Sequence, residues 1–233
     1  MISLTAAEQQ SSASLPLAAF VAACALVFTV ASFWWINARQ GDLKVWEPHS
    51  FAAAVTSKIA RIRFPLVLYN TGAKPIVVLD LRLRFLDEPG SALVLPWTST
   101  RDRLRPEEAD DFRLPACFAV TGRTAEQLFI EFGAPFPAFV PEARDYKVVV
   151  EAKLGYRKLR HRTLGRRGDW QALVVFPLRV GHIAHPSSYI AYSNSPHDMT
   201  EDDRREAEVA LSDLRAKFKG GAAARRAPEP EAE

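Results

Sequence analysis

The sequence predicts a mainly β protein, in which an antiparallel β-sandwich of seven or eight strands lies between a transmembrane helix and a C-terminal amphipathic helix. Three observations predict this. A long uncharged run comes near the start, apolar residues alternate with polar ones through the middle, and a capped helical pattern follows. Of the 233 residues, about 140 remain for the sandwich, which is enough for one domain with a sizeable core.

The uncharged run at residues 15–36 predicts a single transmembrane helix. At about 1.5 Å per residue it is long enough to cross the roughly 30 Å hydrocarbon layer of a bilayer. Pro16 falls in its first turn, and Trp34 and Trp35 fall at its other end, where indole rings favour the headgroup region. A cleaved signal peptide is the alternative, but the basic segment that begins one is missing and no small-residue cleavage site precedes Asn37.

Charges beside this run predict its orientation. No Lys or Arg precedes it, whereas Arg39 and Lys44 follow it closely, with Asp42 between them. Because cytoplasmic flanks carry the excess of Lys and Arg, we expect a single-pass protein of the cell membrane with its soluble domain in the cytoplasm. The net charge of +3 gives no indication of nucleic-acid binding.

Composition divides the chain into seven segments. We expect a short N-terminal segment (1–14), the transmembrane helix (15–36), a linker (37–44), the β-sandwich domain (45–181), a loop (182–199), a helix (200–219) and a disordered tail (220–233). The tail is assigned as disordered because it mixes Ala, Arg, Pro and Glu without apolar bulk.

Alternation with period two predicts the strands. The clearest case, residues 77–85, predicts a strand that buries Val77, Leu79, Leu81, Leu83 and Phe85. A strand at 62–68 precedes it, and the turn at 70–75 between them predicts a hairpin. Further strands are expected at 92–97, 112–120, 127–132, 146–156 and 170–180. No helical pattern separates these strands, which favours an antiparallel sandwich over a parallel sheet.

One local motif resembles a known family. Val140-Pro141, followed by Asp145-Tyr146-Lys147, resembles the tyrosine corner of immunoglobulin and fibronectin type III-like sandwiches. The resemblance implies that Tyr146, at the start of the penultimate strand, bonds to the backbone just upstream. Unlike antibody domains, the chain has no Cys pair across the sheets, and the strand after the turn at 70–75 has no Trp. Such sandwiches serve adhesion, scaffolding and ligand binding alike, so the resemblance implies no activity.

The C-terminal pattern predicts a helix with one narrow apolar stripe. Thr200 followed by three acids forms a capping box, and the helix is expected to end before Gly220. The stripe consists of Ala207, Leu211, Leu214 and Phe218. It suits packing on the sandwich, which we expect, or contact with a partner helix.

The most unusual charge pattern lies between the last two predicted strands. Its positive residues, with no acid among them, are Lys153, Arg157, Lys158, Arg160, Arg162, Arg166 and Arg167. With seven strands this basic loop lies at the membrane end of the sandwich and binds an anionic bilayer. With eight strands it lies at the far end, where an acidic protein or nucleic acid is the partner. The alternative to both binding roles is a solvated loop without a ligand.

Catalytic and cofactor motifs are missing from the sequence. No nucleophile elbow, phosphate loop or dinucleotide fingerprint occurs, which predicts no enzyme, no cofactor and no small-molecule substrate. His182, His185 and His197 are the best metal candidates, but no Cys or Glu completes a ligand set, so no metal site is expected. The acids of residues 107–111 indicate a solvated turn, and Cys117 a packed or edge thiol.

Two functional hypotheses remain. The favoured one is a membrane-tethered, non-catalytic module that binds or scaffolds a protein partner, or binds the anionic bilayer, through the basic loop or the C-terminal helix. The alternative is an enzyme accessory or ligand-binding domain that uses the region of His182, His185 and His197.

Overall fold

The computed structural model of the chain describes residues 14–56, 58–87, 94–105, 107, 110–135, 142–155, 170–196 and 200–224, the side chains of 14–16, 135 and 218–224 excepted. The elements in these residues are α1 (Ser14–Asn37), β1 (Leu43–Val45), β2 (Ser50–Val55), β3 (Ile59–Asn70), β4 (Ile76–Phe85), β5 (Val94–Arg101), β6 (Phe118–Val120), β7 (Ala125–Pro135), β8 (Asp145–Leu154), β9 (Trp170–Arg179), the 3-10 helix η1 (Val180–His182), β10 (Ile190–Ser193) and α2 (Glu201–Ala224).

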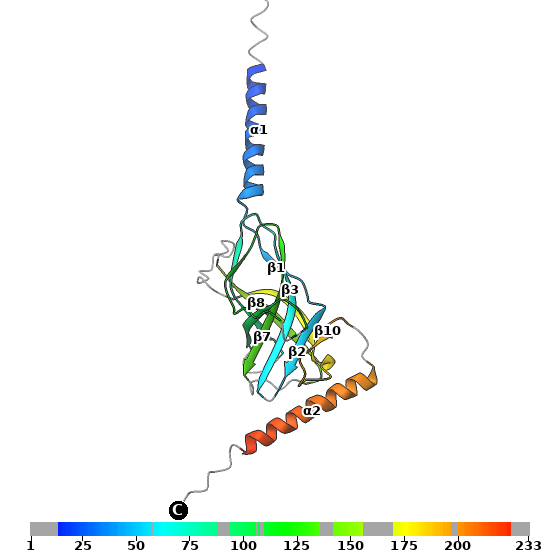
Figure 1. The fold of residues 1–233 in the computed structure, drawn as a ribbon. Helices are drawn as coiled ribbons and strands as arrows, with labels where there is room; N and C mark the ends of the chain where they lie inside the picture. Colours follow the sequence, from blue (N-terminus) through cyan, green and yellow to red (C-terminus); the bar gives the residue numbers. More distant parts are fainter. Residues whose placement is uncertain are drawn as a thin grey trace, which may run out of the picture.

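The strands pair antiparallel and form two packed layers (Figure 1). One layer has the order β10-β2-β3-β7-β5, with β1 beside β3, and the other has β5-β4-β8-β9, with β6 beside β4. Phe64 of β3 and Phe176 of β9 touch across the layers, with ring centroids 5.4 Å apart. The predicted mainly β architecture with two helices is confirmed, although the described residues form ten strands rather than seven or eight.

Strand β5 belongs to both layers. Its residues 94–96 pair with β4, and its residues from Trp97 onward pair with β7. The register shifts between Trp97 and Ser99, and a bulge or bend of this kind lets a strand turn the corner of a sandwich. Side chains from both layers therefore enclose a single apolar core.

The predicted hairpin between residues 62–68 and 77–85 is wrong. Strand β3 pairs with β1, β2 and β7, whereas β4 pairs with β5, β6 and β8. The turn after Asn70 therefore carries the chain from one layer to the other. Turn residues report that the chain reverses, but they do not say whether the next strand pairs or crosses the core.

The predicted register of β4 is correct for only part of the strand. Pairing with β8 shifts between Val78 and Asp80, so even-numbered residues face the core up to Val78 and odd-numbered residues from Leu81 onward. Val77 and Leu79, which were expected inside, are 40% and 37% exposed. One inserted residue reverses the faces of everything beyond it.

Polar side chains close the two ends of the sandwich. At the α1 end, the Asn70 amide donates to the carbonyls of Lys74 and Val120 at 2.9 and 3.1 Å. At the opposite end, the buried Tyr146 hydroxyl accepts a hydrogen bond from the N–H of Glu142 at 2.8 Å. The upstream backbone contact implied by the tyrosine corner is therefore present.

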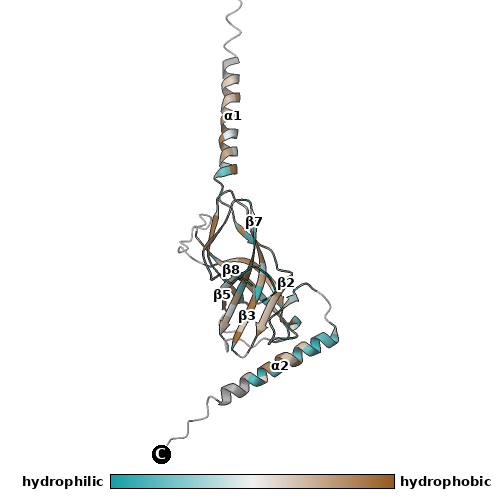
Figure 2. Ribbon diagram, viewed as in Figure 1, coloured by the Kyte–Doolittle hydropathy of each residue, from teal (hydrophilic) through white to brown (hydrophobic). Residues whose placement is uncertain are grey.

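The two helices differ in surface and in attachment (Figure 2). Helix α1 is apolar along most of its length, whereas α2 mixes hydrophilic and hydrophobic residues. The Thr200 hydroxyl accepts from the N–H of Asp203 at 3.2 Å, as the capping pattern predicts, but α2 continues to Ala224, beyond the predicted end.

Helix α2 packs against the end of the sandwich away from α1 (Figure 1). Its Ala207 and Leu211 side chains are buried, and the helix contacts η1. Arg215 pairs with Glu142 at 2.8 Å, beside the tyrosine corner. Two members of the predicted stripe therefore face the sandwich.

Candidate functional site

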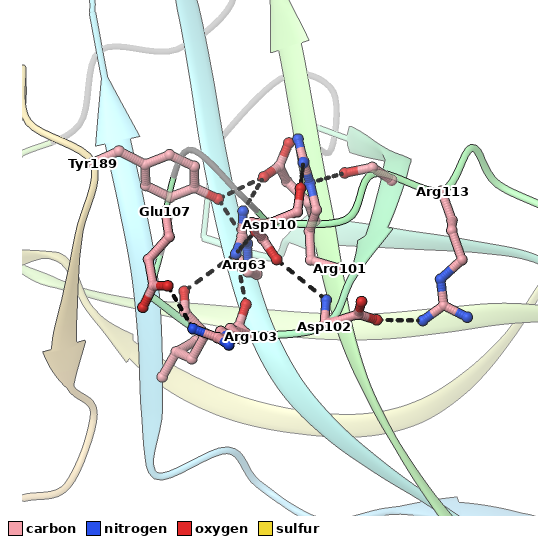
Figure 3. Close-up of polar contacts among 11 residues, drawn as sticks. Arg63, Arg101, Asp102, Arg103, Glu107, Asp110, Arg113 and Tyr189 are labelled. Carbon is pink, nitrogen blue, oxygen red and sulfur yellow. Dashed lines mark hydrogen bonds and ion pairs between the residues drawn. The ribbon is translucent and has the colours of Figure 1, made fainter.

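A buried arginine organises the outer side of the β3 layer (Figure 3). Its neighbours Ile62 and Phe64 belong to the core, so the alternation of side chains points Arg63 to the opposite face of the strand. The Arg63 side chain is nevertheless only 1% exposed. The chain between β5 and β6 contacts it, and the Tyr189 ring lies 5.2 Å from the guanidinium carbon.

All three nitrogens of the Arg63 guanidinium donate hydrogen bonds. Nε donates to the Tyr189 hydroxyl at 3.2 Å, and NH1 donates to the carbonyl of Arg103 at 2.6 Å and to Asp110 at 2.8 Å. NH2 donates to Glu131, the cross-strand neighbour on β7, at 3.2 Å. The Tyr189 hydroxyl in turn donates to the same Glu131 oxygen at 2.6 Å.

This arrangement raises the pKa of Arg63 and of Tyr189. Burial lowers the pKa of Arg63, but its interactions with Tyr189, Asp110 and Glu131 outweigh burial and raise that pKa above the ordinary range. Burial, and next the Glu131 carboxylate, raise the pKa of Tyr189 well above its ordinary value. The phenol therefore stays protonated and keeps donating to Glu131.

The Arg63 cluster locks the loop after β5 onto the sheet. Asp110, expected in a solvated turn, is buried against Arg63, so that prediction is wrong for this residue. Around it, Arg113 pairs with Asp102 at 2.8 Å, and Arg103 pairs with Glu107 (Figure 3). Every nitrogen of the buried Arg63 guanidinium donates to a protein partner, which is typical of a structural network rather than a catalytic one.

The other layer carries one carboxylate between two arginines. Glu151 of β8, with a side chain 7% exposed, accepts from Arg82 at 2.6 Å and from Arg84 at 2.8 Å, both on the adjacent β4. The Arg82 guanidinium also lies 4.1 Å from the centroid of the Trp170 ring. The Arg82 and Arg84 side chains are 25% and 34% exposed. This second cluster is therefore open to water and carries a net positive charge.

The end of α1 is hydrogen-bonded to the sandwich. The carbonyl of Trp35 accepts from the Arg123 guanidinium at 2.8 Å, and the Arg39 guanidinium lies 3.9 Å from the centroid of the Trp35 ring. The Arg39 carbonyl accepts from the N–H of Ala73 at 2.8 Å. One turn of the domain thus meets the last turn of α1 through Arg123, and another meets Arg39 just beyond it.

The predicted linker at 37–44 is held on the domain. The Asp42 N–H donates to the Thr71 hydroxyl at 2.9 Å, and the Thr71 N–H donates to the Asp42 carbonyl at 3.1 Å. Gly41 packs so closely on Gly72 that a Cβ on Gly41 would lie 1.9 Å from the Gly72 nitrogen. No larger residue fits either position without moving backbone.

Most of the predicted basic loop lies outside the described residues. Of its seven members only Lys153, in β8, is described; Arg157, Lys158, Arg160, Arg162, Arg166 and Arg167 are not. The strand ends beside the loop are informative. Leu154 pairs with Val78, close to the start of β4, and β4 begins directly after the turn that contacts the α1 linker. Both strands that flank the loop therefore reach toward the α1 end.

The predicted histidine region forms no ligand set among the described residues. His182 Nδ1 lies 2.7 Å from the carbonyl of Ser193, a contact that fits donation from the ring, and His185 contributes its carbonyl to Tyr192 at 3.3 Å. His197 lies outside the described residues. In the described part of the chain, no group of three His, Cys, Asp or Glu is placed to hold a metal ion.

The Arg63 and Glu151 clusters, and the contacts of Arg123 with α1, were missed by sequence reasoning. A charged residue inside an apolar strand, as at Arg63 and Glu131, was the available signal. It does not distinguish a solvent-facing charge from one covered by a distant loop.

Comparisons with known proteins leave the family open. No protein-family model matches the sequence, and no curated protein matches it. A solved structure described as "Crystal structure of protein from Archaeoglobus fulgidus" is similar, with a TM-score of 0.31 and 11% sequence identity. The alignment covers 66% of this chain and 100% of that chain.

Proposed function

We propose that this protein is a membrane-anchored, non-catalytic β-sandwich module whose α1 end binds the anionic surface of the bilayer. The observation that carries the proposal is the direction of β8 and β9. The strand ends that flank the basic loop, at Leu154 and Trp170, lie toward the end of the domain where α1 is attached. A domain held by α1 then presents that loop to the membrane.

The anchor is supported by the length and surface of α1. Residues Leu17–Asn37 are long and apolar enough to cross a membrane, and the sandwich buries none of them. Trp34 and Trp35 lie at the domain end, which suits the headgroup region. An N-terminal signal sequence can pass the same test of length and composition, so the mature protein must be tested for α1.

Electrostatics support binding to an anionic leaflet. Each Lys or Arg near such a surface contributes about 1 kcal/mol. The effect falls off within a Debye length of roughly 8 Å, so position on the domain matters more than net charge. Arg39 and Lys44 beyond α1 favour a cytoplasmic domain, where the anionic lipids are.

We also propose a relationship of the sandwich to a known class and a protein partner for α2. The Tyr146–Glu142 hydrogen bond supports a relationship to immunoglobulin and fibronectin type III-like sandwiches, which commonly scaffold other proteins. On α2, Val209 is exposed on the face of the helix opposite the buried Ala207 and Leu211. We propose that this face receives a protein partner.

The anchor is tested on the full chain in cells. We expect the protein to stay with membranes in alkaline carbonate, with an intact mass that includes residues 15–36. A shortened, soluble product would show that α1 is a signal sequence.

Bilayer binding is tested on a chain that starts at Arg39, after circular dichroism has shown that it is folded. We expect it to bind anionic vesicles at low salt and to dissociate by about 0.5 M salt. Replacing Arg157, Lys158, Arg160 and Arg162 by Gln should abolish binding. The matched control replaces Lys58, Arg61, Arg204 and Arg205, which are exposed cations elsewhere. Equal binding to neutral vesicles would contradict the proposal.

A further inference from the structure

We infer that the last turn of α1 and the two domain turns beside it form a site for the phosphate groups of anionic lipids, made by Arg39, Lys74 and Arg123. This inference rests on the proposed anchoring of the chain by α1. It adds a site of described residues that is separate from the basic loop of residues 153–167.

The three cations come from distant parts of the sequence and meet at one helical turn. Arg39 stacks on the Trp35 ring at 3.9 Å, and Arg123 donates to the Trp35 carbonyl at 2.8 Å. Lys74 follows Ala73, and the N–H groups of both residues point to the Arg39 carbonyl, at 3.4 and 2.8 Å. The fold thus brings the Arg39 and Arg123 side chains, and the backbone of Lys74, to the point where the apolar helix ends.

The backbone at Arg123 supports a positioned side chain. Among the described residues, Arg123 is the only residue other than Gly with a positive φ, at 58°. This left-handed conformation is unfavourable for a residue that carries a side chain. Next to it, a Cβ on Gly122 would lie 2.0 Å from the Ala73 carbonyl oxygen. The turn keeps this conformation, and it brings the Arg123 guanidinium to α1.

The cations retain hydrogen-bond donors for a ligand. A guanidinium has five N–H donors, and within the described residues Arg123 uses NH2 on the Trp35 carbonyl while Arg39 contacts Trp35 through its face. The Lys74 side chain is exposed. Asp42 is the nearest acid along the linker, so the four side chains together carry a net positive charge. Guanidinium forks match phosphate oxygens well.

The depth of the site in a bilayer identifies the ligand. If Leu17–Asn37 crosses the roughly 30 Å hydrocarbon layer, the residues directly after it lie in a headgroup layer about 5–7 Å thick. Arg39 is two residues beyond Asn37, and Lys74 and Arg123 are held at the same level by their contacts with Arg39 and Trp35. The phosphates of lipids around α1 lie at this depth.

The test measures lipid binding to the purified full chain in a mild non-ionic detergent by native mass spectrometry. Phosphatidylglycerol and phosphatidylcholine are the two probes. We expect wild type to prefer phosphatidylglycerol, and the variant Arg39→Gln/Lys74→Gln/Arg123→Gln to lose at least about tenfold in affinity for it. Lys58→Gln/Arg61→Gln/Arg205→Gln, which removes three exposed cations elsewhere, should bind like wild type.

Two further variants keep the result interpretable. Lys74→Gln alone changes an exposed side chain and should lower the affinity about threefold with the fold unchanged. Arg39→Lys/Lys74→Arg/Arg123→Lys keeps every charge and should retain the preference for phosphatidylglycerol. Loss of preference in this variant would also overturn a site based on charge.

The other outcomes separate this inference from the proposed function. Equal losses in the site variant and the Lys58/Arg61/Arg205 control would overturn the site. So would displacement of the lipid by excess inorganic phosphate, which would show a soluble-anion site. If the preference is lost only on replacing Arg157, Lys158, Arg160 and Arg162, the site is wrong and the basic loop is responsible. Release of wild type from membranes by carbonate overturns the anchor on which both rest.

Discussion

The two layers of the sandwich use the same residue types in opposite arrangements. In the β3 layer one arginine, Arg63, donates hydrogen bonds to two carboxylates and a tyrosine, and all three of its guanidinium nitrogens are bonded to protein. In the other layer one carboxylate, Glu151, serves two arginines that are partly exposed. A sealed charge needs every partner in place, whereas an open one can exchange a partner for water. The first arrangement therefore stabilises the fold, and the second leaves a positive surface.

The largest expected effect is the loss of the sealed cation. Arg63→Met leaves the carboxylates of Asp110 and Glu131 buried without their cation, so we expect a loss of about 3–5 kcal/mol in the free energy of unfolding. Urea unfolding of the full chain in detergent, followed by near-ultraviolet circular dichroism, measures it. A loss below about 1 kcal/mol would show that the cluster is open to water.

A matched pair compares the two clusters directly. Glu131→Gln leaves the buried Arg63 with one carboxylate fewer and should cost about 2–3 kcal/mol. Glu151→Gln leaves Arg82 and Arg84 free to turn toward solvent and should cost about 1 kcal/mol or less. The same unfolding experiment compares them. Equal losses of stability in the two variants would mean that solvent exposure does not determine how much each cluster contributes.

Alkaline pH acts on the sealed cluster through Tyr189. Its pKa is raised in the folded state, mainly by burial and by Glu131, whereas in the unfolded chain it titrates near the ordinary value of about 10. The contribution of the protonated Tyr189 to folding stability is thus fully present below about pH 10, and it is lost as the pH rises toward the pKa of the folded state. Stability should fall more steeply above pH 10 in wild type than in Tyr189→Phe. Burial also raises the pKa of Tyr192, and this residue makes the same contribution to the pH dependence of stability in both proteins.

The smallest expected effect concerns the open cluster. Arg84→Gln removes a partner that is about one-third exposed, while Arg82 remains on Glu151. The loss should be below about 1 kcal/mol and should shrink further as salt is added. Urea unfolding of wild type and variant at low and high ionic strength tests it. A large loss of stability that does not depend on salt would show that the Glu151 cluster is sealed from water, as the Arg63 cluster is.

The sequence predicts the individual strands better than their partners. Alternation of apolar and polar residues in the sequence located β4, β7, β8 and β9. It missed β2, whose residues 51–55 are all buried and show no alternation, and the short strands β1 and β10. It also placed Val77 and Leu79 on the wrong face, because a register shift leaves no local mark in an apolar run.

The contacts that define the sites are long-range and were not predictable. Arg63 and Glu131 are separated by 68 residues, and Arg63 and Tyr189 by 126. Only the pairing of β3 with β7, and the return of the chain before β10, bring them together. By contrast, Glu142 and Tyr146 are only four positions apart in the sequence, and their hydrogen bond follows from a local pattern.

Strand β5 has a consequence for how the domain folds. Since it hydrogen-bonds to β4 through one half and to β7 through the other, neither layer keeps its full set of pairs once the other is lost. The sandwich should therefore unfold cooperatively as one unit rather than layer by layer. Its central pairing, β3 with β7, joins segments that are distant in the chain. Sheets built from such non-local pairs fold on the scale of milliseconds to seconds.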